Sequence, residues 1–193
     1  MSSQNNTQND SDNEECQTYR VPDQKSIQEI LKIDNEDESL MKYKNRLLGS
    51  AVPPALFPDD ERNVIFERLS LTVTGKEPSY LCLKNPKKLS DVTLKLHQAD
   101  QFKIGFEFYV QREIVSGLKY VFKMKKLGIK LHKDSVMIGS YAPNSEKIVY
   151  QGSVEECPKT GVISMGKFVI KSQIVDDYGK VYLEFSWNLD IQK

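Results

Sequence analysis

The sequence predicts an all-β sandwich that follows an arm containing two short helices, and three observations support this fold class. The period of the apolar residues changes from 3.6 to 2 near residue 64. Of the 18 aromatic residues, 15 follow residue 63. The formal net charge of zero divides at the same place, into 13 acidic and 7 basic side chains (−6) before residue 64 and 14 acidic and 20 basic (+6) after it. Only the second part is rich enough in large apolar side chains to build a core.

The N-terminal part is expected to be a disordered tail followed by a helical arm. Residues 1–18 consist mostly of Asn, Gln, Ser, Asp and Glu, which cannot offset their ordering entropy by burial. A first helix is expected from Ser26, with Glu29 at the reciprocal position of a capping box. A second, with an apolar stripe, is expected to end at Gly49. Helices this short need a surface on which to dock.

Three prolines and an acidic run in residues 49–63 predict an extended linker. We therefore divide the chain into a disordered acidic tail (1–18), a regulatory helical arm with its linker (19–63) and a sandwich domain (64–193).

The final strand carries the clearest alternation, since Val181, Leu183, Phe185, Trp187, Leu189 and Ile191 alternate with mostly polar residues. In order along the chain, similar alternation predicts strands near residues 65–73, 79–84, 92–96, 102–110, 118–124, 136–141, 146–151 and 162–174. Eight or nine strands without intervening helices indicate an antiparallel sandwich of the immunoglobulin type, with a barrel as the alternative.

Signatures of catalysis and of membrane attachment are missing from the sequence. It has no phosphate-binding loop, no GxSxG elbow and no HExxH, and we interpret His97 and His132 as ordinary surface residues. Cys16, Cys82 and Cys157 form no CxxC pair and are expected to be reduced. With no apolar span or lipidation motif, the chain is expected to be a cytoplasmic protein without metal, cofactor or enzymatic activity.

Clusters of charge admit several interpretations. Six lysines between Lys119 and Lys133 alternate with apolar residues, which is typical of a sheet with one exposed face. Contact with a membrane surface or an acidic partner explains this stretch better than nucleic-acid binding does. The acidic residues 34–38 exceed what a helix cap requires and are available for a partner. Two further acidic pairs, at 155–156 and 176–177, are expected in strand connections.

Several strings of residues resemble the Rho GDP-dissociation inhibitor family from about residue 19 to residue 192. In the arm they are YRVP at 19–22, KSIQEI at 25–30 and DESL at 37–40. In the sandwich they are VQREIVSGLKY at 110–120, MIGSYAP at 137–143, VEECPKTG at 154–161 and WNL at 187–189.

The resemblance implies a non-covalent function. Members of this family bind prenylated Rho-, Rac- or Cdc42-type small GTPases, preferably in the GDP form, hold the switch regions closed, and remove the geranylgeranyl group from the membrane. The implied contact with the membrane is transient, and no nucleic acid is involved. The alternative is an isoprenoid-binding carrier that solubilises other lipidated proteins without controlling nucleotide exchange.

The resemblance also implies two sets of site residues and one modification site. The prenyl-binding positions are Leu48, Leu71, Leu94, Phe102, Ile114, Ile170 and Trp187. The GTPase-binding positions are Tyr19, Asp37, Ser39, Tyr43, Glu155, Glu156, Asp176 and Asp177. The loop at 176–177 is one residue shorter than in the family, which leaves open which aspartate makes the contact. Ser26 matches a phosphorylation position, where a phosphate would disturb docking of the arm.

Overall fold

The computed structural model describes residue 29 and residues 54–193. Glu29 is helical, at a position within the first expected helix. The rest of the arm, the acidic tail, and the site residues Tyr19, Ser26, Asp37, Ser39, Tyr43 and Leu48 lie outside the described residues.

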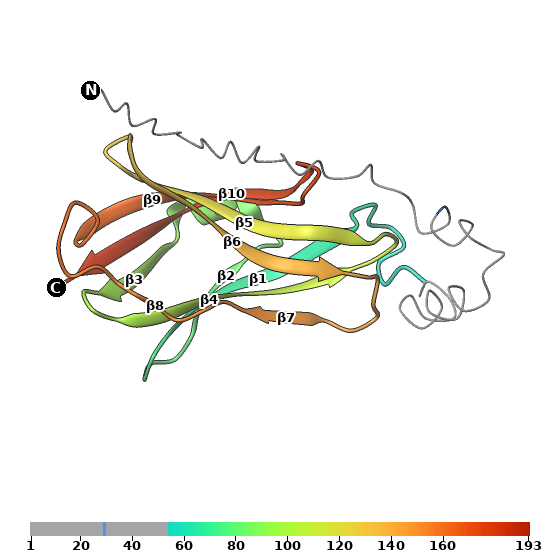
Figure 1. Ribbon diagram of the computed structural model, residues 1–193, viewed down its shortest axis with the longest axis horizontal. Helices are drawn as coiled ribbons and strands as arrows, with labels where there is room; N and C mark the ends of the chain where they lie inside the picture. The colour runs from blue at the N-terminus through green and yellow to red at the C-terminus, as the bar shows by residue number, and fades with distance from the viewer. Residues whose placement is uncertain (1–28, 30–53) are drawn as a thin grey trace, which may run out of the picture.

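Two β-sheets pack face to face and confirm the all-β sandwich (Figure 1). The first has the order β2-β1-β4-β7, with β8 also paired to β4, and the second has the order β3-β10-β9-β5-β6. The bounds are β1 Val64–Val73, β2 Ser79–Cys82, β3 Thr93–His97, β4 Gln101–Val110, β5 Val115–Lys126, β6 Ile129–Tyr141, β7 Ile148–Gln151, β8 Glu155–Glu156, β9 Gly166–Val175 and β10 Val181–Gln192. A short 3₁₀ helix, η1 (Pro86–Asp91), precedes β3.

Strand β1 departs from simple alternation. Strict alternation along the strand expected at residues 65–73 places Ile65 on the same face as Leu69, but the register of β1 against β4 shifts between Phe66 and Arg68. This β-bulge turns Phe66 into the core, where its ring lies 5.1 Å from that of Phe108, and places Ile65 on the opposite face. The extra residue in a bulge reverses the facing of the residues before it, so a strict period of two misassigns them.

The expected antiparallel pairing is wrong for one pair of strands among residues 54–193, which runs in parallel. Strand β3 pairs with β10 in the parallel sense, with Leu94 opposite Leu189 and Leu96 opposite Ile191. The chain reaches β3 from the other sheet by way of η1, so no hairpin sets its direction. Apolar alternation defines the buried face of a strand but carries no information about its direction.

A hydrogen-bonded trio lies within the core of the second sheet. Trp187 Nε1 donates to Ser172 Oγ at 3.1 Å, and the Tyr120 and Ser172 hydroxyls are bonded at 2.9 Å. Burial raises the pKa of Tyr120 to about 12, with the Ser172 hydrogen bond opposing the shift. Within the described part of the chain, every buried side-chain nitrogen and oxygen has a hydrogen-bond partner. The trio ties β5, β9 and β10 together side by side.

The end of the linker is bound to the sandwich. Gln111 is buried; its Oε1 accepts from Phe57 N at 3.1 Å and its Nε2 donates to the Arg62 carbonyl at 2.8 Å. Arg112 donates to the carbonyl oxygens of Pro58 and Asp60. The Gln-Arg pair of the 110–120 string therefore fixes where the arm leaves the domain.

Replacement Ser172→Ala tests the buried trio. It leaves the Trp187 N–H and the Tyr120 hydroxyl without their partner, so we expect the free energy of unfolding to fall by about 1–3 kcal/mol. Denaturant unfolding, followed by the fluorescence of the only tryptophan, measures this loss. Ser186→Ala, on the outer face of β10, is the matched control. An equal effect of both replacements would contradict the role of the trio.

Candidate functional site

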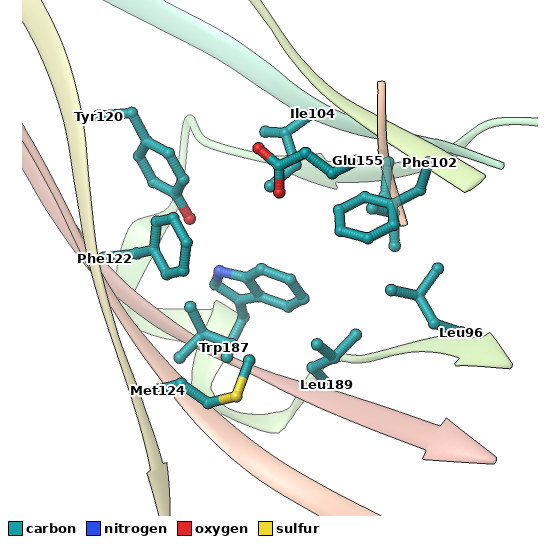
Figure 2. Close-up of a pocket in the computed structure, with 11 residues that line it drawn as sticks. Leu96, Phe102, Ile104, Tyr120, Phe122, Met124, Glu155, Trp187 and Leu189 are labelled. Atoms are coloured by element: carbon teal, nitrogen blue, oxygen red, sulfur yellow. The ribbon is translucent and has the colours of Figure 1, made fainter. Parts of the chain in front are cut away.

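A narrow apolar cavity of about 60 Å³ lies between the two sheets (Figure 2). The first sheet contributes residues from β1, β4 and β8, and the second contributes residues from β3, β5, β9 and β10. The lining residues are Leu71, Leu96, Phe102, Ile104, Tyr120, Phe122, Met124, Glu155, Ile170, Trp187 and Leu189. Figure 2 shows the Trp187 indole in the middle of this group, with Phe102 and Phe122 on either side.

Four of the expected prenyl-binding residues lie together in this pocket: Leu71, Phe102, Ile170 and Trp187. Two others do not line it. Leu94 is buried in the core on β3, and Ile114 is half-buried in the segment between β4 and β5. Leu48 lies outside the described residues.

The pocket includes six apolar or aromatic residues that the resemblance did not assign: Leu96, Ile104, Tyr120, Phe122, Met124 and Leu189. The sequence contained a signal for three of these residues. Leu96, Ile104 and Leu189 each lie two positions from an assigned residue on the same strand. In a strand, residues two apart share a face. The structure also leaves Phe102, Ile104 and Phe122 partly exposed, which locates the mouth of the pocket on β4 and β5.

Glu155 places a carboxylate in this apolar setting. Strand β8 pairs Glu155 with Phe102, and Figure 2 shows the carboxylate pointing inward toward Trp187. Burial raises the pKa of Glu155, the negative charge of Asp134 raises it further, and His132 opposes both effects. Glu155 and Glu156 are both exposed, and Glu156 pairs with Lys159 at 2.9 Å. The two glutamates, both assigned to the GTPase contact by the resemblance, differ in that Glu155 lines the apolar pocket and Glu156 does not.

The two aspartates of the β9–β10 loop differ in how far they are exposed. Asp176 is 3% exposed; its Oδ1 accepts from the amides of Tyr178 and Lys180, and its Oδ2 accepts from the Tyr182 hydroxyl, all at 2.9 Å. These bonds hold the loop in shape. Asp177 is partly exposed and forms an ion pair with Lys119 at 2.5 Å. Asp177 thus has the carboxylate that a partner can reach.

Gly117 makes room for Asp177. Its φ is +62°, a region that favours glycine, and a Cβ at this position would overlap the Asp177 carboxylate. The Gly117 amide donates to Ser140 Oγ at 2.9 Å, and Asp177 N donates to the Ser116 carbonyl at 3.1 Å. Ser116 and Gly117 of the 110–120 string, together with Ser140 of the 137–143 string, therefore form the backbone surroundings of Asp177.

Neither histidine lines this pocket, and neither do Cys82 and Cys157, the two cysteines among residues 54–193. His97 is exposed beside Asp100, and His132 Nε2 lies 3.9 Å from Asp134. Cys82 and Cys157 are free thiols. Among residues 54–193 no group of three His, Cys, Asp or Glu side chains is placed to hold a metal ion. No helix within the described residues is long and apolar enough to cross a membrane.

Two facing sheets with an apolar pocket between them define this molecule as a β-sandwich protein. The family model described as "RHO protein GDP dissociation inhibitor" matches residues 3–193. The chain is 41% identical over 180 residues to a "Probable rho GDP-dissociation inhibitor" of Caenorhabditis elegans, covering 91% of this chain and 92% of the relative.

Two further relatives agree. Identity is 39% over 188 residues to "Rho GDP-dissociation inhibitor 1" of Homo sapiens (94% of this chain, 89% of the relative). It is 35% over 182 residues to "Rho GDP-dissociation inhibitor" of Saccharomyces cerevisiae (91% and 90%). The chain belongs to the Rho GDP-dissociation inhibitor family, whose members are regulatory binding proteins rather than enzymes.

Replacement Glu155→Gln tests the environment of the pocket carboxylate. The pKa of Glu155 in the folded protein lies above its ordinary value of 4.5. Ionisation of this carboxyl therefore lowers the free energy of unfolding as the pH rises through that pKa. Glu155→Gln should therefore increase the free energy of unfolding at pH 7. The gain should be less than about 1 kcal/mol, since water reaches the group, and should disappear as the pH falls below about 4.

Denaturant unfolding at a series of pH values measures this difference. Glu156→Gln, which removes a charge from an exposed ion pair, is the control and should show no such gain. A loss of stability in Glu155→Gln at pH 7 would contradict the assigned environment.

Proposed function

We propose that this protein binds GDP-bound, prenylated Rho-, Rac- or Cdc42-type GTPases, slows GDP release and holds the geranylgeranyl group between its two sheets. The pocket around Trp187 is the observation that carries the proposal, because it is apolar, lies between sheets and opens at one side. The names of the relatives support an inhibitory role toward Rho proteins. A cytoplasmic location belongs to this proposal.

The pocket must widen to accept such a lipid. Its 60 Å³ is far below the roughly 300 Å³ or more of ordinary ligand sites. The sheets of a sandwich lie about 10 Å apart and are joined across the gap by side-chain packing. Phe102 and Ile104 on one sheet and Phe122 on the other are only partly buried, so they can move at lower cost than the buried core.

Burial of the isoprenoid contributes about 0.8 kcal/mol per methylene, or on the order of 10 kcal/mol for the whole chain. A bilayer offers nearly the same gain. Transfer of the lipid to the pocket is therefore close to neutral, and contacts between the two proteins must determine extraction.

The arm supplies these protein contacts. Tyr19, Asp37, Ser39 and Tyr43 are proposed to meet the switch regions, with Asp37 as a hydrogen-bond acceptor. Gln111 and Arg112 hold the end of the linker at the end of the sandwich opposite the C-terminus, and the β9–β10 loop lies at that same end (Figure 1). We therefore assign Asp177 to the GTPase contact and Asp176 to support of its loop.

Two further proposals concern charge. Glu155 and Glu156, both exposed, are proposed to meet the basic segment near the prenylated cysteine, and the position of Glu155 in the pocket lining supports its lying closer to the lipid. Phosphorylation of Ser26 would add negative charge to the acidic arm and weaken its docking.

Replacement Asp37→Ala tests the arm. We expect it to accelerate GDP release from the complex with a prenylated Rho GTPase by about tenfold, the cost of one charged hydrogen bond. Release of a fluorescent GDP analogue measures the rate. Asp10→Ala, in the acidic tail, is the matched control. If full-length wild-type protein leaves release unchanged, the inhibitor function fails and the carrier alternative is preferred.

Replacement Ile104→Glu tests the pocket. The side chain lies at the mouth on β4, so a carboxylate there should abolish extraction of a prenylated GTPase from vesicles without unfolding the domain. Val149→Glu, on β7 of the same sheet and 62% exposed, is the control and should extract normally. Sedimentation of the vesicles measures extraction. Normal extraction by Ile104→Glu would remove this cavity from the lipid site.

A further inference from the structure

The turn between β5 and β6 exposes an apolar side chain in an unfavourable backbone conformation. Lys126 pairs with Ile129, so Leu127 and Gly128 form the two-residue turn. Their φ angles are +49° and +82°, the pattern of a turn that favours Asn-Gly. Leu127 is nevertheless 96% exposed, and Ile129 is 67% exposed. A large apolar residue in the left-handed region is costly and here has no compensating contact with the core.

Like charges surround this tip. Lys125 lies opposite Lys130, and Lys123 lies opposite both Lys133 and Lys171, forming a row across β6, β5 and β9. Like charges directly opposite one another destabilise a sheet. Within residues 54–193, none of the ion pairs that the structure shows includes any of these five lysines. This basic row therefore faces solvent without local neutralisation.

A second exposed apolar group lies beside the tip. Lys126 Nζ donates to the Met165 carbonyl at 3.0 Å, which holds the β8–β9 loop against the hairpin. Met165 is 52% exposed and Val162, in the same loop, is 69% exposed. Figure 1 shows the β5–β6 turn projecting at the end of the sandwich where the C-terminus lies. Tyr120, Phe122 and Met124 line the pocket, and the strand that carries them, β5, leads directly to this tip.

We propose that the β5–β6 tip is a membrane-docking element, in which Leu127 inserts into the headgroup region of an anionic bilayer while the lysines bind the lipid phosphates and carboxylates. Protruding apolar residues ringed by basic side chains are the combination that binds anionic interfaces. A protein partner would need a continuous surface of roughly 1,000 Å² in total, and a two-residue turn offers a projection instead of a flat face. Docking by this end would bring the pocket close to the bilayer.

The experiment uses full-length protein and vesicles without any GTPase, so its outcome does not depend on the proposed inhibitory function. Wild-type protein should sediment with vesicles containing phosphatidylserine and much less with phosphatidylcholine alone. Leu127→Asn should weaken this binding about tenfold, the effect expected for one partly inserted leucine. Asparagine suits the turn, so thermal stability should be unchanged or higher. Val149→Asn, exposed on the opposite sheet, is the control.

A double variant, Lys125→Glu with Lys130→Glu, tests the charge of the basic row. It should reduce binding to phosphatidylserine vesicles at least tenfold. Lys87→Glu with Lys88→Glu, exposed on η1, makes the same change in net charge elsewhere and should have little effect. Inhibition of GDP release in the absence of membranes should be the same for wild type and Leu127→Asn.

Three results would overturn the proposal. The first is equal or absent binding of the wild type to both vesicle compositions. The second is full binding by Leu127→Asn, which would leave only a non-inserting electrostatic contact. The third is retention on immobilised polyglutamate but not on phosphatidylserine vesicles, which would assign the lysines to an acidic polypeptide.

Discussion

The structure depends on one arrangement, a sandwich whose two sheets are joined across their gap by apolar side chains and that leaves a narrow cavity where the packing is weakest. Within the second sheet, Ser172 ties Tyr120 and Trp187 together by buried hydrogen bonds. Across the gap at the pocket, the contacts are apolar except for Glu155. Apolar contacts have no fixed direction, so the sheets can separate locally while the hydrogen-bonded layers stay intact. A site that must admit and release a long lipid requires sheets that stay intact individually and can separate from each other.

Opposite ends of the sandwich domain have different features. One end carries the clamp of Gln111 and Arg112 on the linker and the loop of Asp177. The other carries the β5–β6 tip with its lysines and the approach to the pocket. In the proposed function the first end faces the GTPase, and in the further inference the second faces the bilayer. The pocket lies along the path between them.

Much of the fold could be predicted from the sequence, because alternation along β10 and β4 marks a buried face directly. The bulge at Phe66 and the parallel pairing of β3 could not, since they depend on contacts with β4 and β10 that leave no mark in a binary pattern. The pocket was predictable in part. Trp187 and Phe102 were identified through the family resemblance, whereas Phe122 and Met124 required knowing where the core is loosest. Asp176 and Asp177 have different surroundings because hydrogen bonds within the loop bury only Asp176. Two adjacent aspartates in a sequence give no sign of which one makes those bonds.

The central claim is that an isoprenoid enters the cavity between the sheets. Trp187, the only tryptophan of the 193 residues, lines that cavity and reports on it directly. The most direct measurement is a fluorescence titration of full-length protein with geranylgeranyl-cysteine methyl ester below its micelle concentration. The account predicts a saturable change in Trp187 emission that is lost in Ile104→Glu and kept in Val149→Glu. An emission spectrum that stays constant, or that changes equally in both variants, would contradict it.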